Sequence, residues 1–140
     1  MAIEKTLTLL EGEIALVTGA TRGIGKSIAD EFAQAGATVI GTATTKEGAE
    51  SISNRLSNLN LNGHGIVLDV ANSEQISKEV GNLKESDLMP SILVNNAGIS
   101  RDNLLMRIKK DEWEKVIATN LSSAFYLSKA VIGSMLKNRH

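Results

Sequence analysis

The residues best suited to chemistry form a glycine-rich segment near the amino terminus, Thr18-Gly19-Ala20-Thr21-Arg22-Gly23-Ile24-Gly25. An apolar run at residues 14–17 precedes it, and a helical pattern at residues 24–35 comes directly after it. Glycines between a strand and a helix occur where backbone must approach something closely. The usual occupant is a nucleotide pyrophosphate, bound by amide N–H groups and the positive end of the helix. The spacing is G-x-x-x-G-x-G rather than the commoner G-x-G-x-x-G, so a simple tight turn stays open as an alternative.

The elements that must position this segment alternate between strand-like and helix-like patterns. The expected strands are residues 14–18, 38–42, 65–70 and 92–95, and the expected helices are residues 25–34, 46–59, 73–83 and 111–137. Gly36 is expected to close the first of these helices, and Ser73 to cap the third. Strands separated by helices imply right-handed crossovers. The sequence therefore predicts one α/β domain with a doubly wound parallel sheet and helices on both faces.

Small, polar or glycine residues come after all four expected strands. The glycine-rich segment comes after the first, residues 41–45 after the second, Asp69-Val70 after the third and Asn95-Asn96-Ala97-Gly98 after the fourth. Folds of this kind bind ligands at the carboxyl ends of their strands. Turn chemistry explains one or two such strand ends, whereas four together predict a ligand site.

The end of the second strand indicates which dinucleotide fits. An NAD site usually has a carboxylate there for the ribose 2′-hydroxyl, but this chain has Thr42, Ala43 and Thr44. Hydroxyl groups can donate to a 2′-phosphate, which a carboxylate would repel. Arg22 adds a planar cation suited to phosphate, although a solvated surface arginine is the alternative. The combination favours NADP.

Two further residues have open roles. Asp69 is placed either to accept a hydrogen bond from adenine or to cap a turn. Asn120 lies on an apolar stripe of the long helix through Trp113, Val116, Ile117, Leu121, Ala124, Leu127 or Ser128, and Val131. We expect Trp113 in the core. A buried Asn120 amide needs partners, since leaving it unpaired costs about 1–3 kcal/mol; a core asparagine bonded to backbone is the alternative to a functional one.

Composition excludes several classes of function. The 140 residues carry a net charge of −1 and are 42% hydrophobic, so the charge balance indicates neither a nucleic-acid partner nor a membrane surface. There are no cysteines, which excludes disulfides and thiolate metal sites. No secretory signal or membrane span is recognisable. We expect a cytoplasmic protein without a metal.

Together the motifs resemble those of the short-chain dehydrogenase/reductase family. The resemblance runs from about Glu11 to the last residue and rests on T-G-x-x-x-G-I-G, Asp69-Val70, Asn95-Asn96-Ala97-Gly98 and Asn120. Residues 39–44, 99–107 and 119–123 are similar to the 3-oxoacyl-acyl-carrier-protein reductases within that family.

This resemblance implies a Rossmann-type three-layer fold, NADPH as cofactor and a 3-oxoacyl substrate carried by acyl carrier protein. It also implies a homo-oligomer, which in the family is a tetramer built partly by the long helix. Asn120 would be catalytic and position a water in the proton relay, while Asn96, Ala97 and Gly98 would line the adenosine and ribose side. The full cofactor-binding set is Gly19, Thr21, Arg22, Gly23, Ile24, Gly25, Thr44, Asp69, Val70, Asn96, Ala97 and Gly98.

The family's serine, tyrosine and lysine of the reaction would lie beyond His140. Tyr126, with Lys129 three residues later, lacks the family's i, i+4 spacing and is expected to pack or form an interface. We therefore expect residues 1–140 to be the NADP-binding portion, truncated after the fourth strand and its helix, with residues 1–12 as a lead segment. Alone, this portion should be inactive, with an uncovered sheet edge. Another short-chain alcohol or ketone dehydrogenase, a non-catalytic NADP-binding module and a truncated subunit are the alternatives.

Overall fold

Four parallel strands, in the order β3-β2-β1-β4, form the centre of the computed structural model, which describes residues 9–98 and 105–139. The elements in chain order are β1 (Ile14–Val17), α2 (Gly23–Gln34), β2 (Thr38–Ala43), α3 (Lys46–Asn58), β3 (Gly63–Val67), α4 (Ser73–Glu85), β4 (Ile92–Val94), η1 (Leu105–Arg107), α5 (Lys110–Ile117), η2 (Ala118–Ser122) and α6 (Ser123–Asn138). The strand order and the helical crossovers confirm the predicted doubly wound α/β fold.

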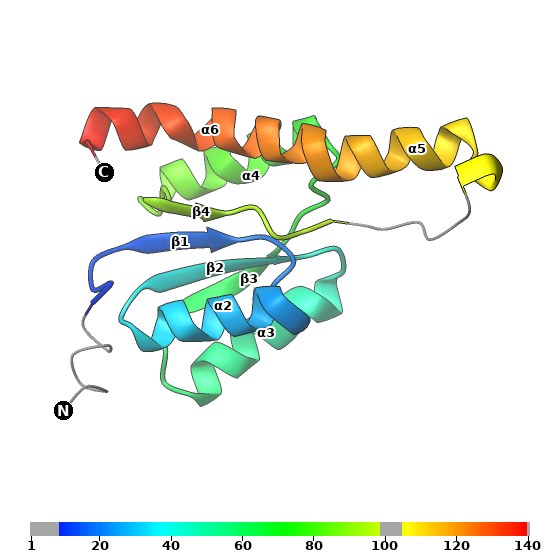
Figure 1. Cartoon of the computed structure of the whole chain (residues 1–140). Coiled ribbons are helices and arrows are strands. Elements are labelled where there is room, and N and C mark those ends of the chain that lie inside the picture. Colours follow the sequence, from blue (N-terminus) through cyan, green and yellow to red (C-terminus); the bar gives the residue numbers. More distant parts are fainter. Residues whose placement is uncertain (1–8, 99–104, 140) are drawn as a thin grey trace.

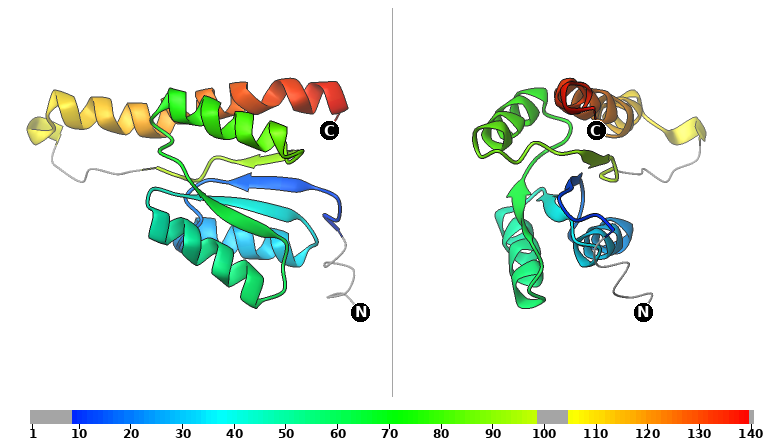
Figure 2. Two further views of the ribbon diagram at one scale, coloured as in Figure 1. Left: turned by 180° about the vertical axis from the view of Figure 1, so that it is seen from behind. Right: turned by 90° about the vertical axis from the view of Figure 1, so that its left-hand side faces the viewer.

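Helices cover both faces of the sheet (Figures 1 and 2). Helices α2 and α3 lie on one face, and α4 and α6 lie on the other. Side chains alternate along each strand, so Val17 and Val39 pack toward α2 and α3, whereas Leu16 and Ile40 pack toward α4 and α6. Each fully buried aliphatic side chain of this kind contributes about 1.5–3 kcal/mol. The two cores hold the strand ends in fixed positions.

The third strand begins earlier than the sequence pattern predicts. Strand β3 is residues Gly63–Val67, paired with β2 from Val39 onward, rather than residues 65–70. Apolar content favoured Leu68 and Val70, but the chain turns toward α4 there, and Asn72 N–H donates to the carbonyl of Asp69 at 3.0 Å. The prediction failed because a strand extends only as far as its backbone pairs with the neighbouring strand, whereas the apolar residues continue into the turn.

Helix ends agree with the sequence in most places. Gly36 has φ of 101° just beyond α2, as expected of a residue that closes a helix. Helix α4 is capped by Asn72 and not by Ser73, because the Asn72 side chain accepts from Glu74 N–H and Gln75 N–H, each at 3.1 Å. Ser73 is instead the first residue of the helix.

The long carboxyl-terminal helix is interrupted by a π-helical turn. Residues Ala118–Ser122 form this turn between α5 and α6. A π turn adds a residue to the helical repeat and so rotates the later residues of the helix relative to the earlier ones. The apolar stripe predicted with an uninterrupted period is therefore wrong in part: Leu127 and Val131 are buried, but Trp113 is 60% exposed. Trp113 is not a core residue in the described structure.

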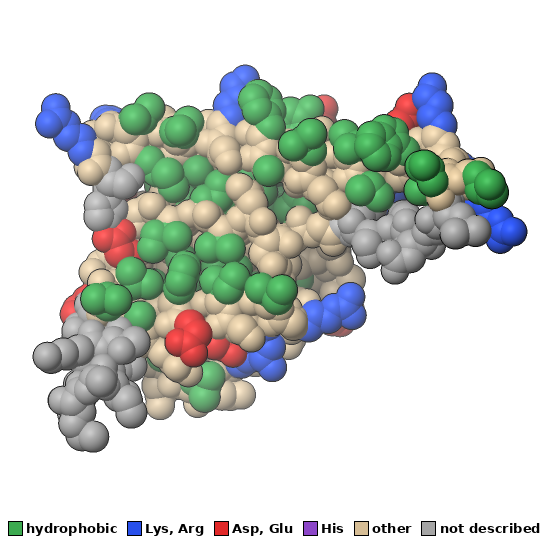
Figure 3. Space-filling model, in the orientation of Figure 1, with side chains coloured by type: hydrophobic (Ala, Val, Ile, Leu, Met, Phe, Trp, Pro, Cys, Tyr) green, Lys and Arg blue, Asp and Glu red, His purple; other side chains and the backbone are tan. Residues whose placement is uncertain are grey.

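Large hydrophobic side chains are exposed along α5, η2 and α6, as Figure 3 shows. Their number includes Leu121, Phe125, Ile132 and Leu136. Strand β4, in the same half of the molecule, pairs with β1 and forms one edge of the described sheet. Within residues 9–98 and 105–139, no helix has the length and apolar character that crossing a membrane requires.

Candidate functional site

The glycine-rich segment joins β1 to α2 at the carboxyl edge of the sheet, which is where the strand-end pattern predicted a ligand site. Its first residue, Thr18, is buried and serves as an anchor. The Thr18 hydroxyl accepts from the backbone N–H groups of Asn96 at 3.0 Å and Ala97 at 2.8 Å. The loop after β1 and the loop after β4 are therefore fastened together through one hydroxyl group.

Asn96 completes this connection from the other side. Its Nδ2 donates to the backbone carbonyls of Thr18 at 3.1 Å and Gly19 at 3.2 Å. Because its side-chain amide donates to these two carbonyls, Asn96 stabilises the conformation of the glycine loop. The resemblance assigned Asn96 to the adenosine and ribose side, and in the structure its side chain points into the protein backbone.

Two of the loop glycines are required by space and backbone conformation. Gly19 has φ of 64°, and a Cβ there would lie 3.1 Å from the Ala97 Cα. A Cβ on Gly25 would collide with the Gly19 carbonyl oxygen and lie 2.5 Å from Asn96 Nδ2. Gly23 has φ of 61° and nothing within 4 Å of where its Cβ would lie, so only the backbone conformation favours glycine at this position.

The amino terminus of α2 differs from those of the other crossover helices. Thr45 caps α3 and Asn72 caps α4 with their side chains, and each of those helices has a glutamate in its first turn. Arg22, the N-cap of α2, makes no side-chain cap, and the first turn of α2 contains no acidic residue. The N–H groups and the positive dipole end at the amino terminus of α2 are thus available to an anion. The pyrophosphate of a dinucleotide is such an anion.

The residues around this helix end are exposed, as ligand contacts should be. Arg22 and Gly23 are exposed, and Ile24 presents a 73% exposed apolar side chain beside them. Thr21 is half-buried and lies near the start of α3, since a Cβ on Gly48 would be 3.1 Å from Thr21 Cγ2. The loop after β1 and the amino end of α3 are therefore neighbours.

The threonines at the end of β2 and just beyond it have different roles. Thr42 is only 1% exposed, and its hydroxyl accepts from Gly19 N–H at 3.2 Å. It supports the glycine loop and is not placed to contact a 2′-phosphate, which corrects the suggestion made from the sequence. Thr44, just beyond β2, is exposed, whereas the Thr45 side chain caps α3.

Asp69 and Val70 form the turn between β3 and α4. The Asp69 carboxylate accepts from Ala71 N–H at 3.0 Å, so it performs the turn-capping role while staying exposed. The Val70 side chain is buried in the core between the sheet and α4. Only the backbone of Val70 can face a ligand.

Asn120 lies in the π-helical turn and faces the loop after β4. A Cβ on Gly98 would lie 2.8 Å from Asn120 Oδ1, so Gly98 leaves room for this side chain. Asn120 is exposed rather than buried, which corrects the expectation of a core amide. The neighbouring Ser123 hydroxyl donates to the Thr119 carbonyl within the turn. Such π turns are frequent at functional sites, and this one turns Asn120 toward the carboxyl edge of the sheet.

Tyr126 and Lys129, also weighed for chemistry, lie on α6 and line a hollow beside Ser73 of α4. Tyr126 contacts the ring of Phe125 edge-on, and Lys129 lies 5.9 Å from the centre of that same ring. The described part of the chain contains no cluster of three or more histidine, aspartate or glutamate side chains that could hold a metal ion. Residues 99–104, which carry part of the narrower resemblance, lie outside the described residues.

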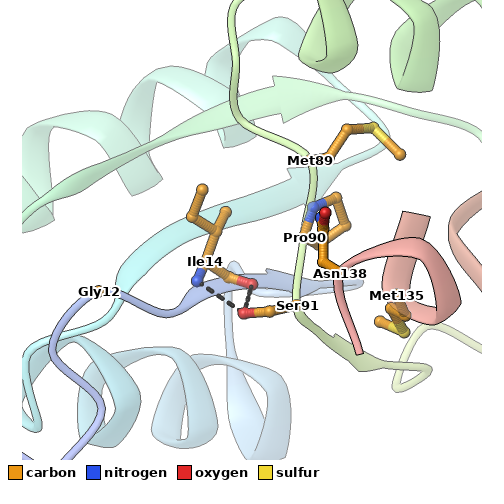
Figure 4. Close-up of a pocket in the computed structure, with 7 residues that line it drawn as sticks. All are labelled: Gly12, Ile14, Met89, Pro90, Ser91, Met135 and Asn138. Atoms are coloured by element: carbon orange, nitrogen blue, oxygen red, sulfur yellow. Dashed lines mark hydrogen bonds between the residues drawn. The ribbon is translucent and has the colours of Figure 1, made fainter. Parts of the chain in front are cut away.

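Two of the hollows on the described part of the chain lie away from the glycine loop. Figure 4 shows a cavity of about 240 Å³ at the amino ends of β1 and β4, lined by Gly12, Ile14, Met89, Pro90, Ser91, Met135 and Asn138. There the Ser91 hydroxyl accepts from Ile14 N–H at 3.1 Å and donates to Glu13 Oε2 at 2.5 Å. A larger groove of about 800 Å³ lies between α4 and α6. Neither hollow is lined by a residue of the glycine loop.

Comparison with known proteins decides the family. A family model described as short chain dehydrogenase matches residues 13–140. The chain belongs to the short-chain dehydrogenase family. This family is one of oxidoreductases.

Several relatives share one name, 3-oxoacyl-[acyl-carrier-protein] reductase FabG. The protein from Escherichia coli (strain K12) is 53% identical over 130 residues, which is 93% of this chain and 52% of the relative. That from Salmonella typhimurium is 54% identical over 129 residues, 92% of this chain and 52% of the relative. That from Pseudomonas aeruginosa is 51% identical over 130 residues, 93% of this chain and 53% of the relative. The chain thus spans about half the length of the curated relatives it matches.

Proposed function

We propose that this chain is the NADP-binding part of a 3-oxoacyl-[acyl-carrier-protein] reductase. The observation that carries the proposal is the uncapped, acid-free amino terminus of α2, presented by a glycine loop that Thr18 and Asn96 hold in place. Identity of 51–54% to relatives of that name supports the substrate class. The absence of cysteine from the 140 residues is consistent with work in the cytoplasm.

The choice of NADP over NAD rests on the residues after β2 and on Arg22. The segment Thr42–Thr45 offers no carboxylate to repel a 2′-phosphate. Thr44 lies just beyond β2, and Arg22 is the N-cap of α2 after the neighbouring strand β1; both are exposed. A guanidinium group there would bind the phosphate through two parallel hydrogen bonds.

Bound NADPH would supply the hydride that reduces the 3-ketone to a 3-hydroxyl group. The chain's own residues would bind and orient: α2 holds the pyrophosphate, and Arg22 with Thr44 selects the 2′-phosphate. Asp69 and the Val70 backbone would face the adenine end. Asn120, in the π-helical turn against Gly98, would position a water for proton transfer. The family's serine, tyrosine and lysine would come from beyond residue 140, so residues 1–140 alone would bind the cofactor without turnover.

The exposed apolar face of α5 and α6 supports a homo-oligomer as the working form. Leu121, Phe125 and Ile132 are each more than half exposed there, and large exposed apolar patches mark contact surfaces. We propose assembly through this face, tetrameric as in the family. Phe125→Lys should then lower the oligomeric mass measured by light scattering, whereas Lys78→Met, at an exposed position of α4, should leave it unchanged.

Reductase activity tests the function. Residues 1–140 would be joined to the carboxyl-terminal half of the Escherichia coli relative and assayed by loss of NADPH absorbance with an acetoacetyl thioester. We expect turnover by the chimera and none by residues 1–140. A chimera that binds NADPH but reduces only other ketones would favour a different short-chain dehydrogenase. Turnover by residues 1–140 alone would refute the claim that their catalytic set is incomplete.

A further inference from the structure

One arginine outside every recognised motif binds the glycine loop. Arg55, near the carboxyl end of α3, donates from Nη2 to the backbone carbonyl of Ala20 at 3.2 Å. Its Nε donates to Asp30 Oδ1 on α2 at 2.9 Å. The Arg55 side chain is 16% exposed and that of Asp30 is 25% exposed, so solvent weakens this ion pair less than a surface pair. One guanidinium group therefore ties α3, α2 and the loop together.

The remaining anchors of the loop come from the strands and their ends. Gly19 N–H donates to the Thr42 hydroxyl, and Ala20 N–H donates to the Thr42 carbonyl at 3.0 Å. Asn96 holds the Gly19 carbonyl. Arg55 holds the next carbonyl along the chain, and it does so from a helix. The loop therefore receives support from both sides of its path.

The planarity of the peptide bond gives this contact a consequence for the ligand site. In a trans peptide unit the C=O and the next N–H point in opposite directions. The preceding unit illustrates this, since the Gly19 carbonyl is bound by Asn96 while Ala20 N–H turns to Thr42. A carbonyl of Ala20 that is held toward Arg55 likewise directs Thr21 N–H away from α3. It also keeps a carbonyl oxygen, which would repel phosphate, from facing the site.

We propose that Arg55, oriented by Asp30, is a positioning residue for the dinucleotide. It fixes the Ala20–Thr21 peptide unit so that Thr21 faces the cofactor. This inference rests on the proposed NADP-binding function. Arg55 touches no reacting atom, and its effect passes through the loop.

Two readouts test the proposal on the 140-residue chain. The first is the hydrogen-exchange rate of the Ala20 amide, which donates to the Thr42 carbonyl at 3.0 Å, measured by NMR without nucleotide. The second is the dissociation constant for NADP⁺. Arg55→Met removes the donors and retains much of the packing, and we expect each quantity to rise about tenfold, since one charged hydrogen bond is lost. Asp30→Asn should give a smaller rise in both, and Arg55→Lys should restore part of each.

A matched control separates positioning from general loss of stability. Leu83→Ala removes a buried side chain of α4 on the opposite face of the sheet, and all variants are compared equally far below their melting temperatures. Unchanged exchange and affinity in Arg55→Met, or changes no larger than in Leu83→Ala, would overturn the proposal. Wild-type protein that does not bind NADP⁺ would defeat the proposed function instead, and Ala20 exchange would still decide the role of Arg55.

Discussion

The side-chain amide of Asn96 donates to the backbone carbonyl of Gly19 at 3.2 Å, so the loop after β4 is hydrogen-bonded to the loop after β1. The same nitrogen also binds the Thr18 carbonyl at 3.1 Å. These contacts join neighbouring strands at the place where their polar ends meet the start of α2. Cofactor affinity should therefore depend on residues that never touch the cofactor.

Replacement of Asn96 tests that dependence. Asn96→Ala leaves two carbonyls without their donor, so the free energy of unfolding should fall by about 1–3 kcal/mol. NADP⁺ affinity should fall with it, measured by fluorescence titration well below the melting temperature. Asn95→Ala is the matched control, because Asn95 is exposed and, among the described residues, its side chain makes one long hydrogen bond, of 3.4 Å to Ser128. Equal effects of the two substitutions would contradict the anchoring role.

Alanine at two helical glycines should have opposite effects. Gly25→Ala would push a methyl group against the Gly19 carbonyl and Asn96 Nδ2, and overpacking of this kind costs about 1–3 kcal/mol or more. Gly81→Ala meets open space in α4 and should stabilise the protein by about 0.5–1 kcal/mol. Chemical denaturation measures both changes. A Gly25→Ala variant of wild-type stability would show that the loop does not approach α2 this closely.

Arg22 should separate the two nicotinamide cofactors. Arg22→Ala removes the exposed cation proposed to bind the 2′-phosphate, so NADPH affinity should fall about tenfold or more while NADH affinity changes little. Lys78→Ala, on exposed α4, controls for the loss of one positive charge. Parallel titrations with both cofactors provide the measurement. Equal losses for NADPH and NADH would remove the assignment of Arg22 to a 2′-phosphate.

The cap of α4 offers a purely structural test. Asn72→Ala removes the acceptor for two N–H groups and should cost about 1 kcal/mol. Ser73→Ala should change stability far less, since Ser73 makes no cap in the structure. Thermal unfolding of the two variants decides between them. A larger loss in Ser73→Ala would restore the capping residue predicted from sequence.

The sequence predicted the fold because hydrophobic pattern and glycine placement act locally. Strand and helix existence could be predicted from periodicity, and the glycine loop was placed correctly at the start of α2. The burial predicted for Asn120 was wrong, because the prediction assumed a regular α-helical period and the π turn changes that period. Thr42 was assigned to the ligand because a strand buried on both faces does not reveal which way its last hydroxyl points.

Long-range contacts could not be predicted from the sequence for a different reason. Arg55 and Ala20 are 35 residues apart, and neither belongs to a motif that predicts their contact. That contact depends on how α2 and α3 pack on one face of the sheet, which only the folded structure contains. Strand β3 was misplaced for a related reason, since its pairing with β2 decides where it ends.

Cofactor preference is the property on which the proposed function depends most. It can be measured by titrating the 140-residue chain with NADPH and with NADH and recording nucleotide fluorescence. We expect saturable binding of both cofactors, tighter for NADPH, and loss of that preference in Arg22→Ala. Absence of binding by folded protein, or a preference for NADH, would show that the chain is not an NADP-binding domain of the proposed kind.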